Sequence, residues 1–191
     1  MKHQRILGSL FAVAAMLPAI ASAAWTLDPS HTNIGFEVDH LGLTKTPGQF
    51  RKFNAQVAFD DERIEKSSVT FTIDAGSIDT LSAVRDADLR GDKWLDAQRF
   101  PSITFTSRTV RRIDASRFVI SGDLTIRGKT LPVDFEGRIT NRVENPFLKV
   151  PSMGFVASTV IRRTTFGIAE YLPVIGDEVT LRVQTELSKA P

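Results

Sequence analysis

Apolar and polar residues alternate through most of the chain, in one short segment after another. In residues 34–39, for example, Ile34, Phe36 and Val38 alternate with small or charged residues. Because successive side chains of a strand point to opposite faces, this period of two is typical of half-buried β-strands. The pattern predicts eight antiparallel strands, at roughly residues 32–40, 48–60, 67–76, 102–110, 116–127, 130–143, 152–161 and 177–188.

Residues 82–98 lack this alternation and predict one or two short helices. Ser82 is a suitable N-cap, since its hydroxyl can accept a hydrogen bond from a free backbone N–H of the first turn. Gly91 is a suitable stop signal, and Pro101 prevents the helix from continuing. The chain has no internal repeat, linker or charge block, so the sequence predicts one domain with a helical insertion.

Eight strands with one apolar face each must bury those faces in a shared interior. A two-sheet sandwich and a closed up-and-down barrel both satisfy this requirement. The connections between successive strands are mostly short, which favours an all-β fold built as an eight-stranded antiparallel barrel. A barrel of this size has room for packed side chains or for one small ligand.

The first 23 residues are typical of a secretory signal peptide. Two basic residues precede an apolar run, and the small residues at 21–23 form a cleavage pattern. A membrane anchor is the alternative, but Pro18 and the cleavage pattern argue against it. We therefore expect cleavage after Ala23, export to a bacterial periplasm, and a single mature domain of residues 24–191.

Composition and charge narrow the choice of function. Two of the 24 Lys and Arg residues lie in the predicted signal peptide, which leaves 22 against 22 Asp and Glu. A formally neutral domain offers no basic surface for nucleic acid. The absence of cysteine excludes disulfide scaffolds, zinc–thiolate sites and thiol nucleophiles. With no Gly-x-Ser-x-Gly motif and no phosphate-binding glycine loop, we expect no enzyme and no cofactor.

The inward positions of the predicted barrel mix large and very small residues. Ala55, Gly122, Gly137 and Ala157 fall in phase with neighbouring Phe and Ile residues. Small residues there would leave volume, and Phe would line it with apolar surface suited to a long hydrocarbon. In the alternative, the glycines mark bulges and facing Phe rings fill the gaps.

A series of short motifs runs along the whole predicted mature chain. They are WTLDPSHT at 25–32, IGFEVDHLGLT at 34–44, GQF at 48–50, LD at 95–96, FPSITF at 100–105, GDLTIRG at 122–128, RRTTFG at 162–167 and IGDEV at 175–179. In this order they resemble the YceI-like family of bacterial periplasmic polyisoprenoid-binding proteins.

The resemblance implies a lipocalin-like barrel that sequesters or carries a long isoprenoid chain, such as a quinone tail or a polyprenyl phosphate, without catalysis. The chain departs from the family pattern at residues 85–89, RDADL, where Arg-Asp-x-His-Leu is frequent. It departs again at residues 93–95, KWL, where two aromatic residues are common. The preferred head group is therefore left open.

The expected ligand contacts come from the inward apolar positions and from the helical insertion, which would close one end of the barrel. Arg163 is expected to bind a phosphate or quinone head group through its paired donors; pairing with exposed carboxylates is the alternative. The full set is Phe36, Val38, Phe53, Phe71, Ile73, Leu89, Trp94, Leu95, Phe105, Ile120, Leu124, Phe135, Phe155 and Arg163.

The other polar candidates have structural interpretations, so we expect no catalytic residue and no metal site. His31 is expected to cap the turn at residues 28–30; a lipid-acting enzyme that uses Asp28 and His31 is the alternative. His40 lies nine residues along the same strand, too far away to share a metal ion with His31. The acidic cluster is expected on a solvated helix face and comprises Asp86, Asp88, Asp92 and Asp96.

An isoprenoid lipid is the expected partner, held without covalent attachment. A transient contact with a membrane or a membrane protein, and a homodimer, stay open. The alternative function is that of a ligand-free solid barrel acting as an interaction or stress-response protein. The amount of free volume inside the barrel decides between the two.

Overall fold

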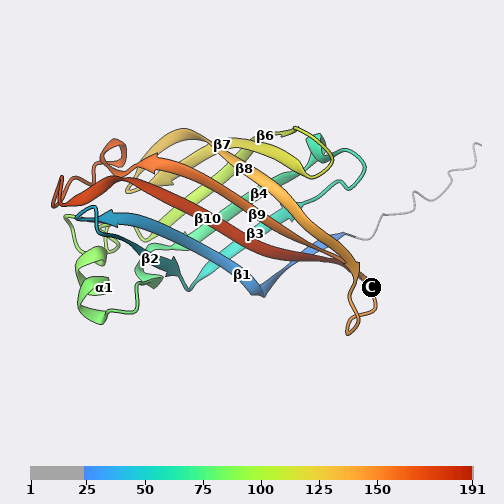
Figure 1. Ribbon diagram of the computed structural model, residues 1–191, viewed down its shortest axis with the longest axis horizontal. Helices are drawn as coiled ribbons and strands as arrows, with labels where there is room; N and C mark the ends of the chain where they lie inside the picture. The colour runs from blue at the N-terminus through green and yellow to red at the C-terminus, as the bar shows by residue number, and fades with distance from the viewer. Residues whose placement is uncertain (1–23, 191) are drawn as a thin grey trace, which may run out of the picture.

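The computed structural model describes residues 24–190 (Figure 1); the predicted signal peptide, residues 1–23, and Pro191 lie outside the described part. The strands are β1 (Trp25–His40), β2 (Thr44–Phe50), β3 (Phe53–Ala58), β4 (Ser68–Asp74), β5 (Ile78–Asp79), β6 (Ser102–Arg112), β7 (Arg117–Ile126), β8 (Lys129–Glu144), β9 (Pro151–Arg162) and β10 (Ile175–Lys189). The helices are α1 (Ala83–Arg90) and the 3-10 helices η1 (Ile64–Lys66), η2 (Ala75–Ser77) and η3 (Arg163–Phe166).

The strands form one curled antiparallel sheet. Its order is β3-β4-β6-β7-β8-β9-β10-β1-β2-β5, so the last strand in sequence pairs with the first. Figure 1 shows the long strands wrapping around a common axis, with α1 at one end. The predicted all-β, barrel-like fold is confirmed.

The described residues contain ten strands instead of the predicted eight, because one predicted strand is divided and the short β5 was not predicted. The segment predicted at 48–60 bends at Arg51-Lys52 into β2, which pairs with β1, and β3, which pairs with β4. The segment predicted at 67–76 passes through η2 into the short β5, which pairs with β2. If β2 and β3 are counted as one strand, and β4 and β5 as another, the sheet is an eight-stranded meander that returns on itself.

Strand β1 contains a bulge that changes its neighbours. Asp28 lies opposite Glu186, whereas Asn33 lies opposite Gln184, so four residues of β1 face one residue of β10. Beyond the bulge, β1 pairs with β2 on its other side. Before it, no described strand pairs with that side, and a seam with β3 remains. The bulge therefore marks where the ladder opens.

The first half of the predicted helical insertion, residues 83–90, forms the helix α1. The Ser82 hydroxyl accepts a hydrogen bond from the Arg85 backbone N–H at 3.5 Å, and α1 ends at Gly91, whose N–H donates to the Asp88 carbonyl at 2.8 Å. Residues 91–99 then form turns. Within residues 24–190, no helix has both the length and the apolar content needed to cross a bilayer.

The inward glycines do not leave empty space, and the corresponding expectation is wrong. A Cβ on Gly137 would lie 2.1 Å from the Phe118 ring, and one on Gly122 would lie 2.6 Å from the Phe105 ring. Phe118 is the direct cross-strand partner of Gly137. Aromatic rings therefore cover these glycines and shield their backbone, as the alternative interpretation proposed.

We expect Gly137→Ala to lower the free energy of unfolding by about 1–3 kcal/mol, because the added methyl group overpacks the interior. The Phe118 ring cannot move aside freely, since it is 4% exposed and packs edge-on against Phe155. Urea unfolding measures the loss. In a Phe118→Leu background the same substitution should cost less; an equal cost in both backgrounds would contradict this packing.

Candidate functional site

A channel of about 400 Å³ runs through the barrel. Ile175 and Leu187 both line it and lie twelve residues apart on β10. That spacing corresponds to about 40 Å along a strand, or about 30 Å along the axis of a barrel with tilted strands. The channel is therefore long and narrow, and its wall is mostly Phe, Ile, Leu and Val.

Aromatic rings form the floor of the channel at the end that carries the β1 N-terminus. Phe59, Phe118 and Phe155 line the channel there. Phe59 packs edge-on against Phe155 at 5.3 Å and against Trp25 at 5.7 Å between ring centroids. These edge-on geometries are favoured for aromatic pairs, so the three rings pack stably against one another and against Trp25.

The opposite end of the channel is its mouth, formed by α1, the turns after it, the β1–β2 turn and the loop before β10. Trp94 and Tyr171 meet there, with ring centroids 6.2 Å apart. Apart from Arg182 on β10, the ionisable residues of the lining all gather at this end; they are His40, Arg85, Asp88, Arg163 and Tyr171. The channel thus combines an apolar interior with one polar opening.

The structure brings together nearly all of the predicted contact residues in the channel wall. Leu89, Trp94 and Leu95 lie at the mouth, as expected for residues that close one end. Phe53 is the exception: it lines a separate pocket between β1 and β3. Its strand is the one that borders the seam, so its side chain packs beside that gap. Ligand binding by the whole set stays a prediction.

Sequence reasoning missed several lining residues. Phe59 and Phe118 alternate in phase with Val57 and Ile120, so the period of two could have identified both floor residues. Tyr171 stands in an irregular loop, where no periodicity marks it. Its place at the mouth depends on contacts that the local sequence does not encode.

Arg163 lies at the mouth, but its side chain is already engaged. It is 4% exposed and donates to the backbone carbonyls of Gly176 at 2.8 Å, Ile175 at 2.8 Å and Ile168 at 3.2 Å. Its guanidinium also stacks over the Trp94 ring at 5.2 Å. Burial lowers the pKa of the guanidinium, and the Asp177 charge opposes this shift. Arg163 therefore anchors the mouth, while its binding of a head group stays a prediction.

The acidic cluster is not uniformly solvated, so the expectation is wrong for Asp86. This residue is 7% exposed, and its carboxylate accepts hydrogen bonds from the Thr80 backbone N–H at 2.8 Å and the Thr80 hydroxyl at 2.6 Å. Arg85 donates to the same threonine. Through these hydrogen bonds to Thr80, Arg85 and Asp86 hold α1 against the segment after β5 at the mouth.

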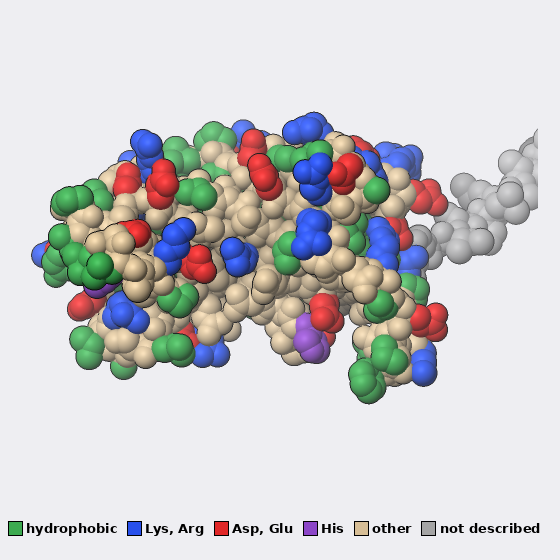
Figure 2. Space-filling view, in the orientation of Figure 1, with side chains coloured by type: hydrophobic (Ala, Val, Ile, Leu, Met, Phe, Trp, Pro, Cys, Tyr) green, Lys and Arg blue, Asp and Glu red, His purple; other side chains and the backbone are tan. Residues whose placement is uncertain are grey.

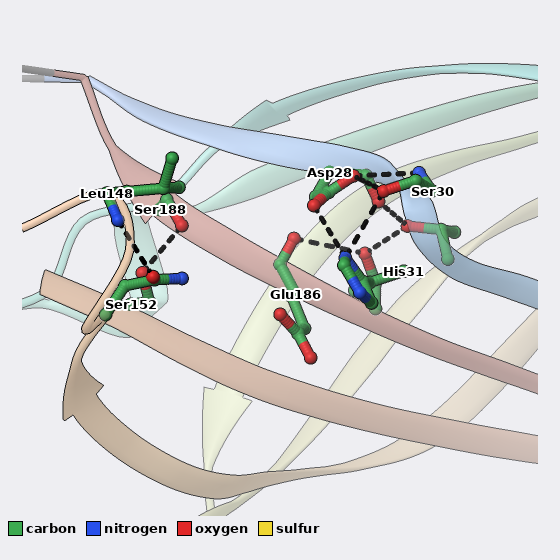
Figure 3. A network of polar contacts seen from close by, with 10 residues as sticks. Asp28, Ser30, His31, Leu148, Ser152, Glu186 and Ser188 are labelled. Atoms are coloured by element: carbon green, nitrogen blue, oxygen red, sulfur yellow. Dashed lines mark hydrogen bonds and ion pairs between the residues drawn. The ribbon is translucent and has the colours of Figure 1, made fainter. Parts of the chain in front are cut away.

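His31 caps the β1 bulge, as the sequence predicts. Figure 3 shows its ring and the Asp28 carboxylate pointing toward each other, with His31 Nδ1 2.8 Å from Asp28 Oδ2. Ser30 donates to the same carboxylate through its hydroxyl at 2.6 Å and its N–H at 2.8 Å. The Ser30 hydroxyl and the Asp28 carboxylate both approach the same ring nitrogen of His31, Nδ1. In a catalytic triad the serine and the carboxylate contact opposite ring nitrogens of the histidine, so this arrangement is not a triad.

These contacts shift two pKa values. The hydrogen bonds from Ser30 and His31 lower the pKa of Asp28 from 3.8 to about 2. The hydrogen bond to Asp28 raises the pKa of His31 above its ordinary 6.5. Neither residue lines the channel. Across residues 24–190, no group of three or more His, Cys, Asp or Glu side chains is placed to hold a metal ion.

Comparisons with known proteins identify relatives of this chain by sequence and by fold. Residues 25–187 match the YceI-like domain family. The chain is 31% identical to protein YceI of Salmonella agona over 186 residues, which cover 96% of each chain. The crystal structure of BcnA from Burkholderia cenocepacia is 25% identical, with a TM-score of 0.76 over 84% of this chain and 99% of that one.

A more distant structure shares the fold alone. It is a polyisoprenoid-binding domain from Saccharophagus degradans, implicated in plant cell wall breakdown. It is 13% identical, covers 88% of this chain and 99% of its own, and has a TM-score of 0.63.

The bulge predicts a specific pH dependence. We expect the His31 ring to titrate above pH 6.5 in an NMR titration, and Asp28→Asn to return the midpoint toward the ordinary value. Stability from the raised His31 pKa is present below pH 6.5 and is lost as pH rises through the folded pKa. Stability from Asp28 is present above 3.8 and is lost as pH falls toward 2. An unchanged His31 midpoint in the variant would contradict the pairing.

Arg163→Met should lower the free energy of unfolding by about 2–4 kcal/mol, because it removes a buried cation that three carbonyls accept from. Arg162→Met is the matched control, since the Arg162 side chain is next to Arg163 in the sequence and is exposed. The control should change stability by less than about 0.5 kcal/mol. Urea unfolding of both variants compares them, and equal losses would contradict an anchoring role for Arg163.

Proposed function

Because this chain belongs to the YceI-like domain family, we propose that it binds a long isoprenoid lipid in its channel and carries or sequesters it in the periplasm. The observation that carries the proposal is the shape of the channel. Its floor is aromatic, its wall is apolar and its ionisable groups gather at one open end. A linear hydrocarbon with a polar head group matches this arrangement.

The energetics support a ligand held mainly by apolar contact. One five-carbon isoprenoid unit contributes about 3–4 kcal/mol when buried, at about 0.8 kcal/mol for each CH₂. About four units would then contribute about 12–16 kcal/mol, against about 4–15 kcal/mol for association and ordering. Micromolar affinity, about 8 kcal/mol net, therefore requires about three to eight buried units, depending on that cost. The channel needs no hydrogen-bond network to bind such a chain.

The mouth supports a head group at the channel opening. Arg85 is exposed there and His40 lies on the same rim, while Asp88 adds a negative charge. Residues 85–89 are also where the sequence departs from the family pattern, so a difference in head-group preference would arise here. A quinone and a polyprenyl phosphate are the two ligand classes that we propose.

The domain neighbour from Saccharophagus degradans is named as a polyisoprenoid-binding domain, and its similar fold supports the proposed ligand class. The periplasmic location rests on the predicted signal peptide, residues 1–23. A homodimer stays a prediction, for which analytical ultracentrifugation is the direct test.

Ala157→Phe should weaken isoprenoid binding at least tenfold while leaving the protein folded. Ala157 lines the channel between Gly137 and Val183, so a Phe ring at this position would block it. Binding is measured by quenching of tryptophan fluorescence on addition of a long-chain quinone, because Trp94 stands at the mouth. Ala157→Leu, a smaller obstruction, keeps the test usable if the Phe variant unfolds.

Ser158→Phe is the matched control, since Ser158 is adjacent on β9 and does not line the channel. It should bind quinone like the unchanged protein. Binding that persists in both Ala157 variants would place the ligand elsewhere. No binding by the unchanged protein to quinone or polyprenyl phosphate would support the ligand-free alternative.

A further inference from the structure

Exposed apolar side chains surround the mouth of the channel. They come in pairs from the β1–β2 turn, from the first turn of α1 and the residues just before it, and from the loop before β10. Figure 2 shows hydrophobic side chains gathered at the end of the molecule that carries α1. Each of these side chains is between 48% and 86% exposed. We call the group the apolar rim; it consists of Leu41, Leu43, Leu81, Val84, Tyr171 and Val174.

The apolar rim is continuous with the channel. Tyr171 belongs to both, and His40, Thr80 and Arg85, which are sequence neighbours of rim residues, line the channel. The Leu41 backbone N–H donates to the Val174 carbonyl at 2.9 Å, which joins two of the three segments. Any molecule that enters the mouth therefore passes this rim.

Backbone strain coincides with exposure at three rim positions. Leu41, Leu81 and Tyr171 have φ angles of 61°, 62° and 56°. Glycine or asparagine adopts this left-handed region more easily than a large side chain does. Large apolar residues in strained, exposed turns contribute little to stability, so the strain indicates a function for the side chains themselves.

We propose that the apolar rim docks on the surface of a lipid bilayer, so that the channel mouth faces the membrane. This inference rests on the proposed function, because an isoprenoid resides in a bilayer and must move from it into the channel. Exposed Leu, Val and Tyr side chains are suited to the boundary between head groups and acyl chains. A patch of this kind on a folded domain marks an interaction site.

Charge around the apolar rim favours apolar insertion over attraction to anionic lipid. Lys93 is 3.4 Å from Glu170, so its charge is offset locally. Arg85 and Asp88 add one charge of each sign at the mouth. Docking should therefore occur on zwitterionic vesicles and change little with salt.

The experiment is flotation of the unchanged protein with phosphatidylcholine vesicles, with a rim variant and a matched control. Leu43→Ser with Val84→Ser removes two rim side chains, each 77% exposed, that do not line the channel. Phe147→Ser with Leu148→Ser removes side chains that are 90% and 60% exposed in the β8–β9 loop at the opposite end. Quinone uptake from vesicles and quinone binding in detergent solution are measured for all three proteins.

The unchanged protein should float with vesicles in both about 0.1 and about 0.5 M salt, because added salt screens interactions between charges and does not weaken apolar insertion. The rim variant should lose at least tenfold in flotation and in uptake rate, with its detergent-phase affinity unchanged. The control variant should match the unchanged protein.

Two results would overturn docking by the apolar rim: no flotation of the unchanged protein, or equal losses in the rim and control variants. If the protein binds quinone in detergent but does not float, docking fails while the proposed function stands, and a protein partner must load the channel. If rim-dependent flotation occurs without quinone binding, docking stands while the proposed function fails.

Discussion

Backbone hydrogen bonding around the curled sheet, which opens only at the seam between β1 and β3, is the constraint on which the rest of this structure depends. The N–H and C=O groups of each strand need partners, and the pairing of β10 with β1 supplies them along most of these two strands. The diameter of such a sheet follows from its strand number rather than from its side chains. Rings such as Phe105 and Phe118 thicken the wall over Gly122 and Gly137, and the space that they leave is the channel. The channel, which is the candidate ligand site, is therefore a consequence of the fold.

Alternation predicted the eight extended segments because each strand buries only one face, which gives the sequence a period of two. The same signal could not locate the break at Arg51-Lys52 or the short β5, since both depend on pairing with distant strands. In hindsight Phe50 and Phe53 lie three residues apart, which is out of phase for one straight strand. The cap and stop of α1 were predictable, because Ser82 and Gly91 act within one helical turn.

The candidate site was also predictable only in part. Lining residues on regular strands were predictable from phase, whereas Phe53 was not excluded because the seam beside β3 has no local signature. Arg163 is predicted from the sequence to bind a head group, yet its guanidinium donates to carbonyls on the loop and strand that follow it. Asp86 resembled a surface acid, yet Thr80 folds back to cover it. In each case the missing information is a contact between segments that one-dimensional periodicity does not contain.

The mouth and the floor give the channel a direction: polar groups and strained apolar turns at one end, packed aromatic rings at the other. Native mass spectrometry of the protein purified without detergent from its native cells tests the central claim most directly. A one-to-one adduct that extracts into organic solvent as a polyprenyl compound is the predicted result. A bare protein mass that persists after incubation with long-chain quinone and polyprenyl phosphate would contradict isoprenoid binding in the channel.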